Sequence, residues 1–285
     1  DYAGAYTANG AGVAIVDTDS DIADVDNGSG VSEATIVLSN AQIGDLLATG
    51  SLPPGVTATF TTSGGAALNG SNVVTTAGIV TLTLTASPAL ALAAFESVLE
   101  AITFSNTSGN PITGDRTISV TVTDDQGTDS NTATSTITVG LDLTQPVHVL
   151  NGSGNVVATF ATIQGAIDAI GDGVTDGGIS LAGISRIVVE PTGTTYTASE
   201  DLVIDVPVSI EGGSGVAGDV VIRSITIQDG ALDGATEAVT VKNVTVQGGA
   251  TLNGITFTDA DGNAEGTLTL DNVSVSGFSH NGLFV

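Results

Sequence analysis

Short alternating runs constrain the fold of this chain more than any other feature. In segments 80–85, 117–123 and 136–139, apolar residues alternate with Thr or Ser, and segment 35–38 is a further short run of β-forming residues. Gly, Asn, Asp or Pro, the residue types that favour turns, bound each run. Period-two alternation between turn residues is typical of strands that bury one face. The sequence therefore predicts an all-β protein.

Residues 1–142 have the pattern of a β-sandwich with one helix in a crossover connection. Ser87 is a candidate N-cap and Pro88 a candidate first helical residue, because both residue types favour helix starts. The apolar residues that would form the buried face of this helix are Leu92, Phe95, Leu99 and Ile102.

The pattern changes near residues 141–146, so we place a domain boundary there and treat residues 143–285 as a second domain. Its first predicted element is an amphipathic helix at 160–170. The apolar face of this helix is formed by Phe160, Ile163, Ile167 and Ile170.

The second domain contains a repeated short motif. Asn243-Val-Thr-Val-Gln-Gly returns as Asn272-Val-Ser-Val-Ser-Gly, and in weaker form as Asn253-Gly-Ile-Thr-Phe and Ile225-Thr-Ile-Gln. Repeated strands separated by turns indicate a solenoid whose coils bury one another. We therefore predict a parallel β-helix, with the helix at 160–170 capping its first coil. Because no second cap follows Val285, we expect the β-helix to be truncated at the C-terminus of this sequence.

The composition of the chain excludes several classes of binding partner. The chain of 285 residues has 31 Asp and Glu against 4 Lys and Arg, a formal net charge of −27. Such a surface disfavours nucleic acid and anionic membranes. No apolar run is long enough for a membrane helix. The absence of Cys excludes disulfides and thiolate zinc sites.

Two acidic groups are candidate Ca²⁺ sites, because Ca²⁺ prefers several oxygen ligands in flexible geometry. The first group lies between residues 17 and 27, and the second follows a predicted strand. Their carboxylates are Asp17, Asp19, Asp21, Asp24, Asp26, Asp124, Asp125 and Asp129. The alternative is that these residues are solvated turn residues. A third acidic group at 259–265 lacks the EF-hand spacing of glycine, and we interpret it as a turn.

An enzyme of this fold would need a basic residue or two paired carboxylates. In the second domain the basic residues are Arg186, Arg223 and Lys242, and the candidate acids are Asp229, Asp233, Asp259, Asp261 and Asp271. Because the sequence does not pair them, we predict no catalytic residue. His148 and His280 lack a ligand partner at metal-binding spacing and are interpreted as structural.

Residues 1–142 resemble the bacterial cadherin-like repeats of large secreted adhesins. The matching pieces are Tyr6-Thr-Ala-Asn-Gly, Asp24-Val-Asp26, the segment 95–106 and the segment 110–127. Residues 147–285 resemble the start of a pectate-lyase-like right-handed β-helix, through the segment 160–170. The first resemblance implies that both acidic groups contribute to Ca²⁺ sites near the ends of the sandwich. Ala8 stands where relatives often carry a calcium-binding Glu.

These resemblances imply an extracellular structural or adhesive module of a bacterial surface protein, stiffened by Ca²⁺ and suited to a surface layer, filament or matrix. The expected partners are neighbouring domains, copies of the same protein and extracellular polysaccharide. The alternative is a carbohydrate-active β-helix enzyme, a lyase or hydrolase, with an accessory sandwich.

Overall fold

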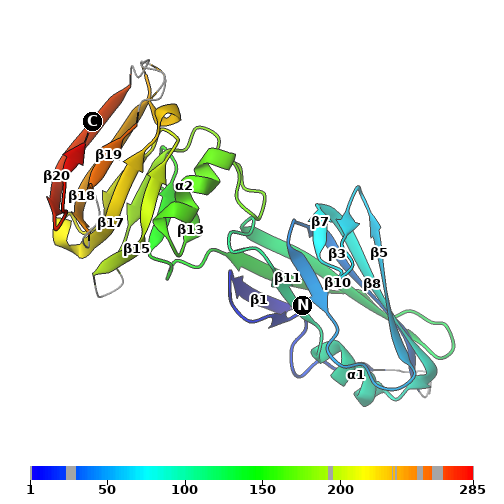
Figure 1. Ribbon diagram of the computed structural model, residues 1–285. Helices are drawn as coiled ribbons and strands as arrows, with labels where there is room; N and C mark the ends of the chain where they lie inside the picture. The colour runs from blue at the N-terminus through cyan, green and yellow to red at the C-terminus, as the bar shows by residue number, and fades with distance from the viewer. Residues whose placement is uncertain are drawn as a thin grey trace. The chain divides into compact units, whose positions relative to one another are not determined.

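The computed structural model describes residues 2–23, 30–191, 195–232, 234, 236–248, 253–258 and 266–284. Strands dominate it, and the predicted all-β class is confirmed. The chain divides into two compact units (Figure 1). Unit 1 comprises residues 1–141 with 176–178, and unit 2 comprises residues 142–175 with 179–285.

Unit 1 is built on a six-stranded sheet and a three-stranded sheet. In spatial order the larger sheet consists of β1 (Tyr2–Thr7), β11 (Ala133–Gly140), β10 (Gly114–Asp124), β3 (Val31–Ala41), β8 (Gly78–Leu90) and β5 (Val56–Ser63). The smaller sheet consists of β2 (Val13–Ala14), β9 (Thr103–Asn106) and β4 (Asp45–Ala48). A hairpin of β6 (Ala67–Leu68) and β7 (Val74–Thr76) completes the strands of this unit.

One hydrophobic core joins the two sheets of unit 1. Ile36, Leu82 and Ile118 of the larger sheet and Phe104 of the smaller sheet are fully buried in it. The alternation seen in the sequence is the reason, since every second residue of these strands points inward.

The helix of unit 1 begins later than the sequence predicts. Helix α1 spans Leu92–Glu100 and buries Phe95, Val98 and Leu99, with Ala91 as an N-cap that makes no side-chain hydrogen bond. Ser87 and Pro88 instead belong to β8, so the predicted start is wrong. The Ser87 amide donates to the Gly55 oxygen and continues the strand. Pro88 lies beyond the last residue pair with β5, where its missing N–H breaks no ladder hydrogen bond.

Unit 2 begins with an antiparallel hairpin, β12 (Val147–Leu150) and β13 (Val156–Phe160), followed by helix α2 (Ile163–Asp172). The helix starts three residues after the predicted boundary, because Phe160 belongs to β13. Thr162 caps it by accepting a 3.1 Å hydrogen bond from the Gly165 amide. Gly173 ends it with φ of 71°, a conformation that glycine adopts without strain.

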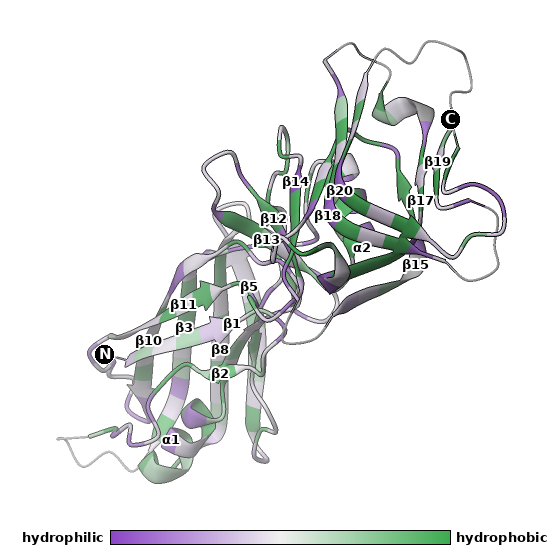
Figure 2. Ribbon diagram, turned by 90° about the vertical axis from the view of Figure 1, so that its left-hand side faces the viewer, coloured by the Kyte–Doolittle hydropathy of each residue, from purple (hydrophilic) through white to green (hydrophobic). Residues whose placement is uncertain are grey.

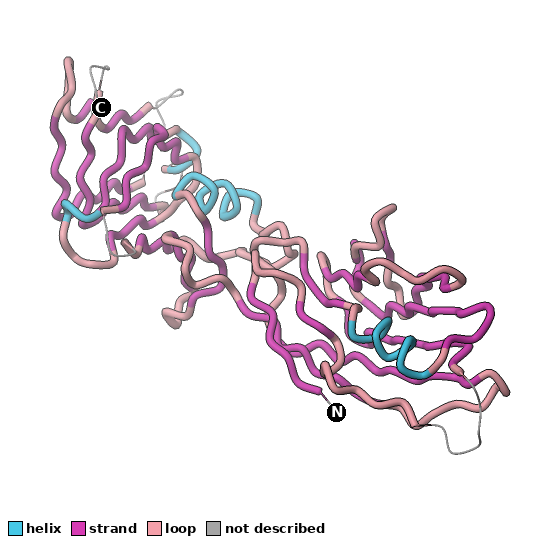
Figure 3. The backbone as a smooth tube through the Cα atoms, turned by 90° about the horizontal axis from the view of Figure 1, so that it is seen from below, coloured by secondary structure: helices cyan, strands magenta, loops and turns pink. Residues whose placement is uncertain are grey.

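The rest of unit 2 consists of strands that pair in parallel with strands further along the chain, and Figure 3 shows these strands side by side. One ladder contains β14 (Arg186–Val189), β16 (Ser209–Gly212), β18 (Ala238–Gln247) and β20 (Thr267–Ser276). The other contains β15 (Tyr196–Ile204), β17 (Val220–Ile227), β19 (Ile255–Phe257) and β21 (Leu283–Phe284). Two 3₁₀ turns, η1 (Ala217–Asp219) and η2 (Asp229–Ala231), lie between strands.

The parallel pairing explains the repeated motif. Val244 of β18 pairs with Val273 of β20, so the two strongest copies of the motif lie side by side. In β18 the side chains of Val239, Val241, Val244 and Val246 are fully buried. The parallel strands of unit 2 therefore stack over an interior of Val and Ile.

Candidate metal centre at one end of the sandwich

Residues 20–22 of the first acidic group are hydrogen-bonded to helix α1. The Ile22 amide donates a 2.8 Å hydrogen bond to Glu96 Oε1. The Ser20 hydroxyl donates a longer bond of 3.4 Å to Glu100 Oε1. Glu96 and Glu100 are four residues apart and therefore lie on the same side of the helix. Two glutamates thus hold the segment that contains Asp21.

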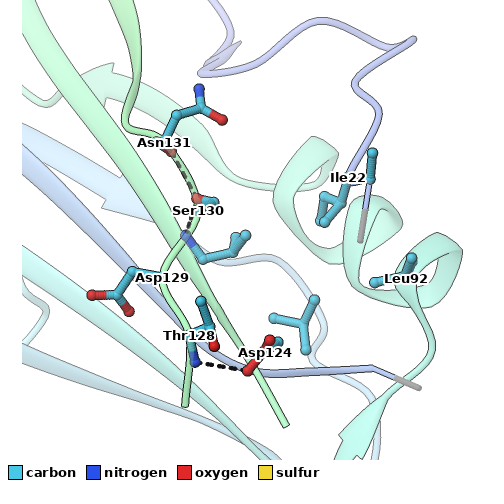
Figure 4. Close-up of a pocket in the computed structure, with 10 residues that line it drawn as sticks. Ile22, Leu92, Asp124, Thr128, Asp129, Ser130 and Asn131 are labelled. Atoms are coloured by element: carbon cyan, nitrogen blue, oxygen red, sulfur yellow. Dashed lines mark hydrogen bonds between the residues drawn. The ribbon is translucent and has the colours of Figure 1, made fainter. Parts of the chain in front are cut away.

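Two neighbouring pockets bring the two acidic groups to the same end of unit 1. A pocket of about 170 Å³ is lined by Asp21 and a pocket of about 240 Å³ by Asp124 and Asp129. The residues that line both are Ile22, Ala23, Val122, Ser130 and Asn131. In Figure 4, Ile22 and Leu92 lie on one side of the larger pocket, and residues 128–131 lie on the other.

Asp124 organises the turn after β10. Its Oδ1 accepts hydrogen bonds of 2.8 Å from the amides of Gln126 and Thr128 (Figure 4). The hydrogen bond from the Thr128 amide is the main reason that the pKa of Asp124 lies below its ordinary value of 3.8, and the Gln126 and Gly127 amides add to it. Asp124 therefore stays ionised in mildly acidic solution, the charge state that a cation ligand needs.

The other predicted ligands have more exposed positions. Asp129 Oδ1 accepts a 2.7 Å hydrogen bond from the Thr123 hydroxyl, and Asp17 Oδ1 accepts a 2.8 Å bond from the Thr18 amide. Asp19 and Asp125 are exposed. Asp24 and Asp26 lie outside the described residues.

Oxygen atoms of several chemical types meet around the two pockets. They come from the carboxylates of Asp21, Asp124 and Asp129, the hydroxyl of Ser130 and the amide of Asn131. Hard divalent cations select such donors. Among the described residues, no three carboxylates or imidazoles already converge at metal-binding distance. The oxygen donors around the pockets are of the chemical type that Ca²⁺ prefers.

Sequence reasoning missed Glu96 and Glu100 as part of this region. The sequence does contain one signal for them: the two glutamates are four residues apart and flank the apolar positions of the predicted helix. The sequence does not reveal the contact between Glu96 and the Ile22 amide, because these residues are 74 positions apart.

A second polar cluster was also missed, and it is buried. Asp45 and Arg116 form an ion pair of 2.7 Å in which both side chains are almost fully buried. Asn106 Nδ2 donates to Asp45 Oδ1 at 2.8 Å, and the Tyr6 hydroxyl donates to the Asn106 backbone oxygen at 2.7 Å. Burial raises the pKa of the Asp45 carboxyl, and hydrogen bonds from Arg116, Gln42 and Asn106 oppose that rise. This cluster ties β1, β4, β9 and β10 together.

In unit 2 the basic residues form ion pairs. Arg186 Nη2 lies 3.2 Å from Glu211 Oε2, and Arg223 Nε lies 3.4 Å from Asp201 Oδ1. Lys242 Nζ lies between two carboxylates, 4.0 Å from Glu211 and 3.6 Å from Asp271. The chain of alternating charges Arg186, Glu211, Lys242 and Asp271 crosses four parallel strands. It aligns the strands at the surface and offers no isolated base.

The remaining predicted residues have separate positions. His148 lies on β12, and its Nε2 is buried without a hydrogen-bond partner among the described residues. His280 Nδ1 is 3.2 Å from the Ser279 hydroxyl. Asp233 and the acidic group 259–265 lie outside the described residues, as does the side chain of Asp229.

Comparisons with protein-family models, with curated proteins and with solved structures each return no match. Both helices of the described residues are too short and too polar to cross a membrane bilayer.

Proposed function

We propose that this chain is a structural or adhesive module of an extracellular bacterial surface protein, and that Ca²⁺ stiffens one end of its sandwich. The observation that carries the proposal is that two acidic groups, about a hundred residues apart in sequence, border adjoining pockets of unit 1. The chain has a net charge of −27, so it has few cationic side chains to balance the carboxylates at that end.

Charge explains why a cation would matter here. Carboxylates held close together repel one another, and a divalent cation among them removes that repulsion. An ion that binds only the folded state also raises its stability by mass action, by about 2.7 kcal/mol at a hundredfold excess over the dissociation constant. The two glutamates of α1 keep Asp21 near the β10–β11 turn, so bound Ca²⁺ would join segment 20–23 to that turn.

The parallel coils of unit 2 supply a rigid spacer in this proposal. Successive coils are joined by continuous backbone ladders and by the surface ion pairs of Arg186 and Lys242. The enzyme alternative lacks a comparable observation, since each Arg and Lys side chain of unit 2 is already paired with a carboxylate. Neighbouring domains and extracellular polysaccharide are the proposed partners.

The experiment is thermal unfolding of the full chain in EDTA, in CaCl₂ and in MgCl₂. The proposal expects Ca²⁺ to raise the transition of unit 1 by several degrees, and Asp21→Asn to reduce that rise. Asp115→Asn is the matched control, because it removes one carboxylate from unit 1 outside the two acidic groups. Identical transitions in EDTA and CaCl₂ would refute the proposal.

A further inference from the structure

The six-stranded sheet of unit 1 ends at β5, whose outer edge pairs with no other strand in the described part of the chain. Figure 2 shows the strands of this sheet side by side. On its inner edge β5 pairs with β8 over its whole length and in one continuous register. In such an antiparallel pair, successive residues direct their backbone N–H and C=O groups alternately toward the neighbouring strand and away from it.

The register identifies the backbone groups at the outer edge. The Ser87 amide donates to the Gly55 oxygen, which places the bonds to β8 at the odd-numbered residues of β5. The residues whose backbone groups point away from β8 are therefore Ala58, Phe60 and Thr62. Within the described ranges, no backbone hydrogen bond to these three residues is formed on that side. Strand β5 thus presents a row of donors and acceptors with which another strand can pair.

This edge has none of the usual features that prevent strand pairing. Natural edge strands are often interrupted by charged residues, by Pro or by a bulge. Strand β5 has the uncharged sequence Val-Thr-Ala-Thr-Phe-Thr-Thr-Ser and an unbroken register with β8. The chain has a net charge of −27, yet it has no ionisable side chain between Asp45 and Glu96. On the outer face of the sheet, Glu33 pairs with Thr85 of β8 and is therefore two strands away from β5.

We propose that two copies of this chain associate edge to edge, with β5 of one copy antiparallel to β5 of the other. A two-fold axis beside Phe60 places Phe60 opposite Phe60 of the second copy, and Ala58 opposite Thr62. All the outward backbone groups of both strands are then used, in about six hydrogen bonds. A second copy fits this edge because its own free groups lie at the same positions and because its edge is also uncharged. Contact elsewhere would bring acidic surfaces together.

The side chain of Phe60 supports the same register. Ala58 and Phe60 are partly buried against the core of unit 1, so both point to the inner face of the sheet. In the symmetric pair the two Phe60 side chains become neighbours on that face, and each covers part of the other. Cross-strand aromatic pairs of this kind stabilise sheets.

The length of the edge predicts a weak interaction. A standard stable interface buries about 800 Å² on each partner, more than one short strand pair supplies. The dimer therefore forms at high local concentration, as where copies are crowded, and separates on dilution. This inference does not depend on Ca²⁺ binding.

The first test is sedimentation velocity of the full chain in EDTA, at up to about 500 µM and in about 300 mM NaCl to screen the net charge. We expect dimers that dissociate on dilution. Thr62→Glu places a carboxylate on the exposed end of the pairing edge and should weaken dimerisation roughly tenfold or more. Thr76→Glu on β7 adds the same charge to the same uncharged segment outside β5, and should leave dimerisation unchanged.

The second test is disulfide cross-linking, because the natural chain has no Cys. The symmetric register places Thr59 opposite Thr61 of the second copy, with Cα atoms about 4.5 Å apart, a distance that a disulfide can span. An equimolar mixture of Thr59→Cys and size-tagged Thr61→Cys, oxidised with diamide, should therefore give the mixed dimer. Thr59→Cys alone should cross-link much less, since its two cysteines would be diagonal neighbours about 7–8 Å apart.

Three results would overturn the proposal. The first is a wild-type chain that stays monomeric at about 500 µM in the salt that screens its charge. The second is equal dimerisation of Thr62→Glu and the wild type, or equal loss in Thr76→Glu. The third is a mixture of Thr59→Cys and Thr61→Cys that cross-links no more than Thr59→Cys alone.

Discussion

The side chain of Asn272 donates a hydrogen bond of 2.9 Å from Nδ2 to Oδ1 of Asn243 on the neighbouring coil of unit 2. Both asparagines have positive φ, 52° and 56°, in the middle of paired strands. Asparagine tolerates this left-handed conformation better than most residues. In the preceding coil the corresponding position is Gly212, where a Cβ would collide with the backbone oxygen of Asn243. The repeated Asn therefore bends each strand and links one coil to the next.

Replacement of this asparagine should destabilise unit 2. We expect Asn243→Ala to lower the free energy of unfolding by about 2 kcal/mol, because it strains the backbone and removes the partner of Asn272. Asn243→Gly should lose less stability, because glycine avoids the part of this loss that is due to backbone strain. Urea unfolding measures both changes.

The control for that measurement is Asn72→Ala in unit 1, because Asn72 has a similar φ of 62° in the turn between β6 and β7. The Asn72→Ala variant measures the free-energy cost of placing Ala in the left-handed conformation within a turn. An equal loss for Asn243→Ala and Asn72→Ala would show that the hydrogen bond between coils contributes nothing.

The buried ion pair of unit 1 should be sensitive to loss of either partner. Asp45→Ala leaves the Arg116 guanidinium buried without its carboxylate, which should cost about 3–5 kcal/mol. Removal of Glu211 from the exposed pair with Arg186 should cost less than about 1 kcal/mol. Chemical denaturation of both variants measures the two losses in free energy of unfolding. Similar losses would contradict the conclusion that burial makes the pair of Asp45 and Arg116 more sensitive than the exposed pair.

The contact between α1 and segment 20–22 should depend on an acceptor oxygen at Glu96. Glu96→Ala should speed hydrogen exchange of the Ile22 amide, while Glu96→Gln should largely preserve its protection because an amide oxygen can still accept. Glu100→Ala should have the smaller effect, since its bond to Ser20 is longer. Unchanged Ile22 exchange in Glu96→Ala would show that the helix does not hold this segment.

The turn after β10 should weaken in acid. The pKa of Asp124 is lowered in the folded state, so its stabilising contribution is present above its ordinary pKa of 3.8. That contribution is lost as the pH falls through the lowered folded value. The amide resonances of Gln126 and Thr128 should therefore titrate below pH 3.8 in NMR spectra. Asp124→Asn should abolish this titration. A midpoint above pH 3.8 in the wild type would contradict the lowered pKa of Asp124.

Local patterns explain which parts of the fold were predictable. The alternation of segments 80–85 and 117–123 predicted strands β8 and β10, and the repeat of Asn243 at Asn272 predicted two neighbouring strands, β18 and β20. The start of α1 was not predictable from Ser87 and Pro88, because pairing with β5 and β3 extends β8 through these residues. Tertiary pairing here outweighed a local capping pattern.

The candidate site was predictable only in part. Asp21, Asp124 and Asp129 could be proposed as ligands because acidic clusters are visible in the sequence. That they border adjoining pockets, and that Glu96 holds the segment beside them, depends on contacts between distant residues. Arg116 is the one Lys or Arg before residue 147, but no role could be assigned to it from the sequence. Its partner Asp45 lies 71 positions away and could not be chosen among the many acids.

The most direct test of the central claim is a Ca²⁺ titration of the isotope-labelled full chain, followed by NMR of its backbone amides. The proposal predicts saturable shifts that concentrate in segments 19–23 and 124–131, which contain the pocket-lining residues 20–23, 124 and 128–131. An equal concentration of Mg²⁺ should produce smaller changes, because Mg²⁺ demands a stricter geometry. Shifts that are absent from both segments, or spread evenly over all acidic residues, would contradict the claim that Ca²⁺ binds at this end of unit 1.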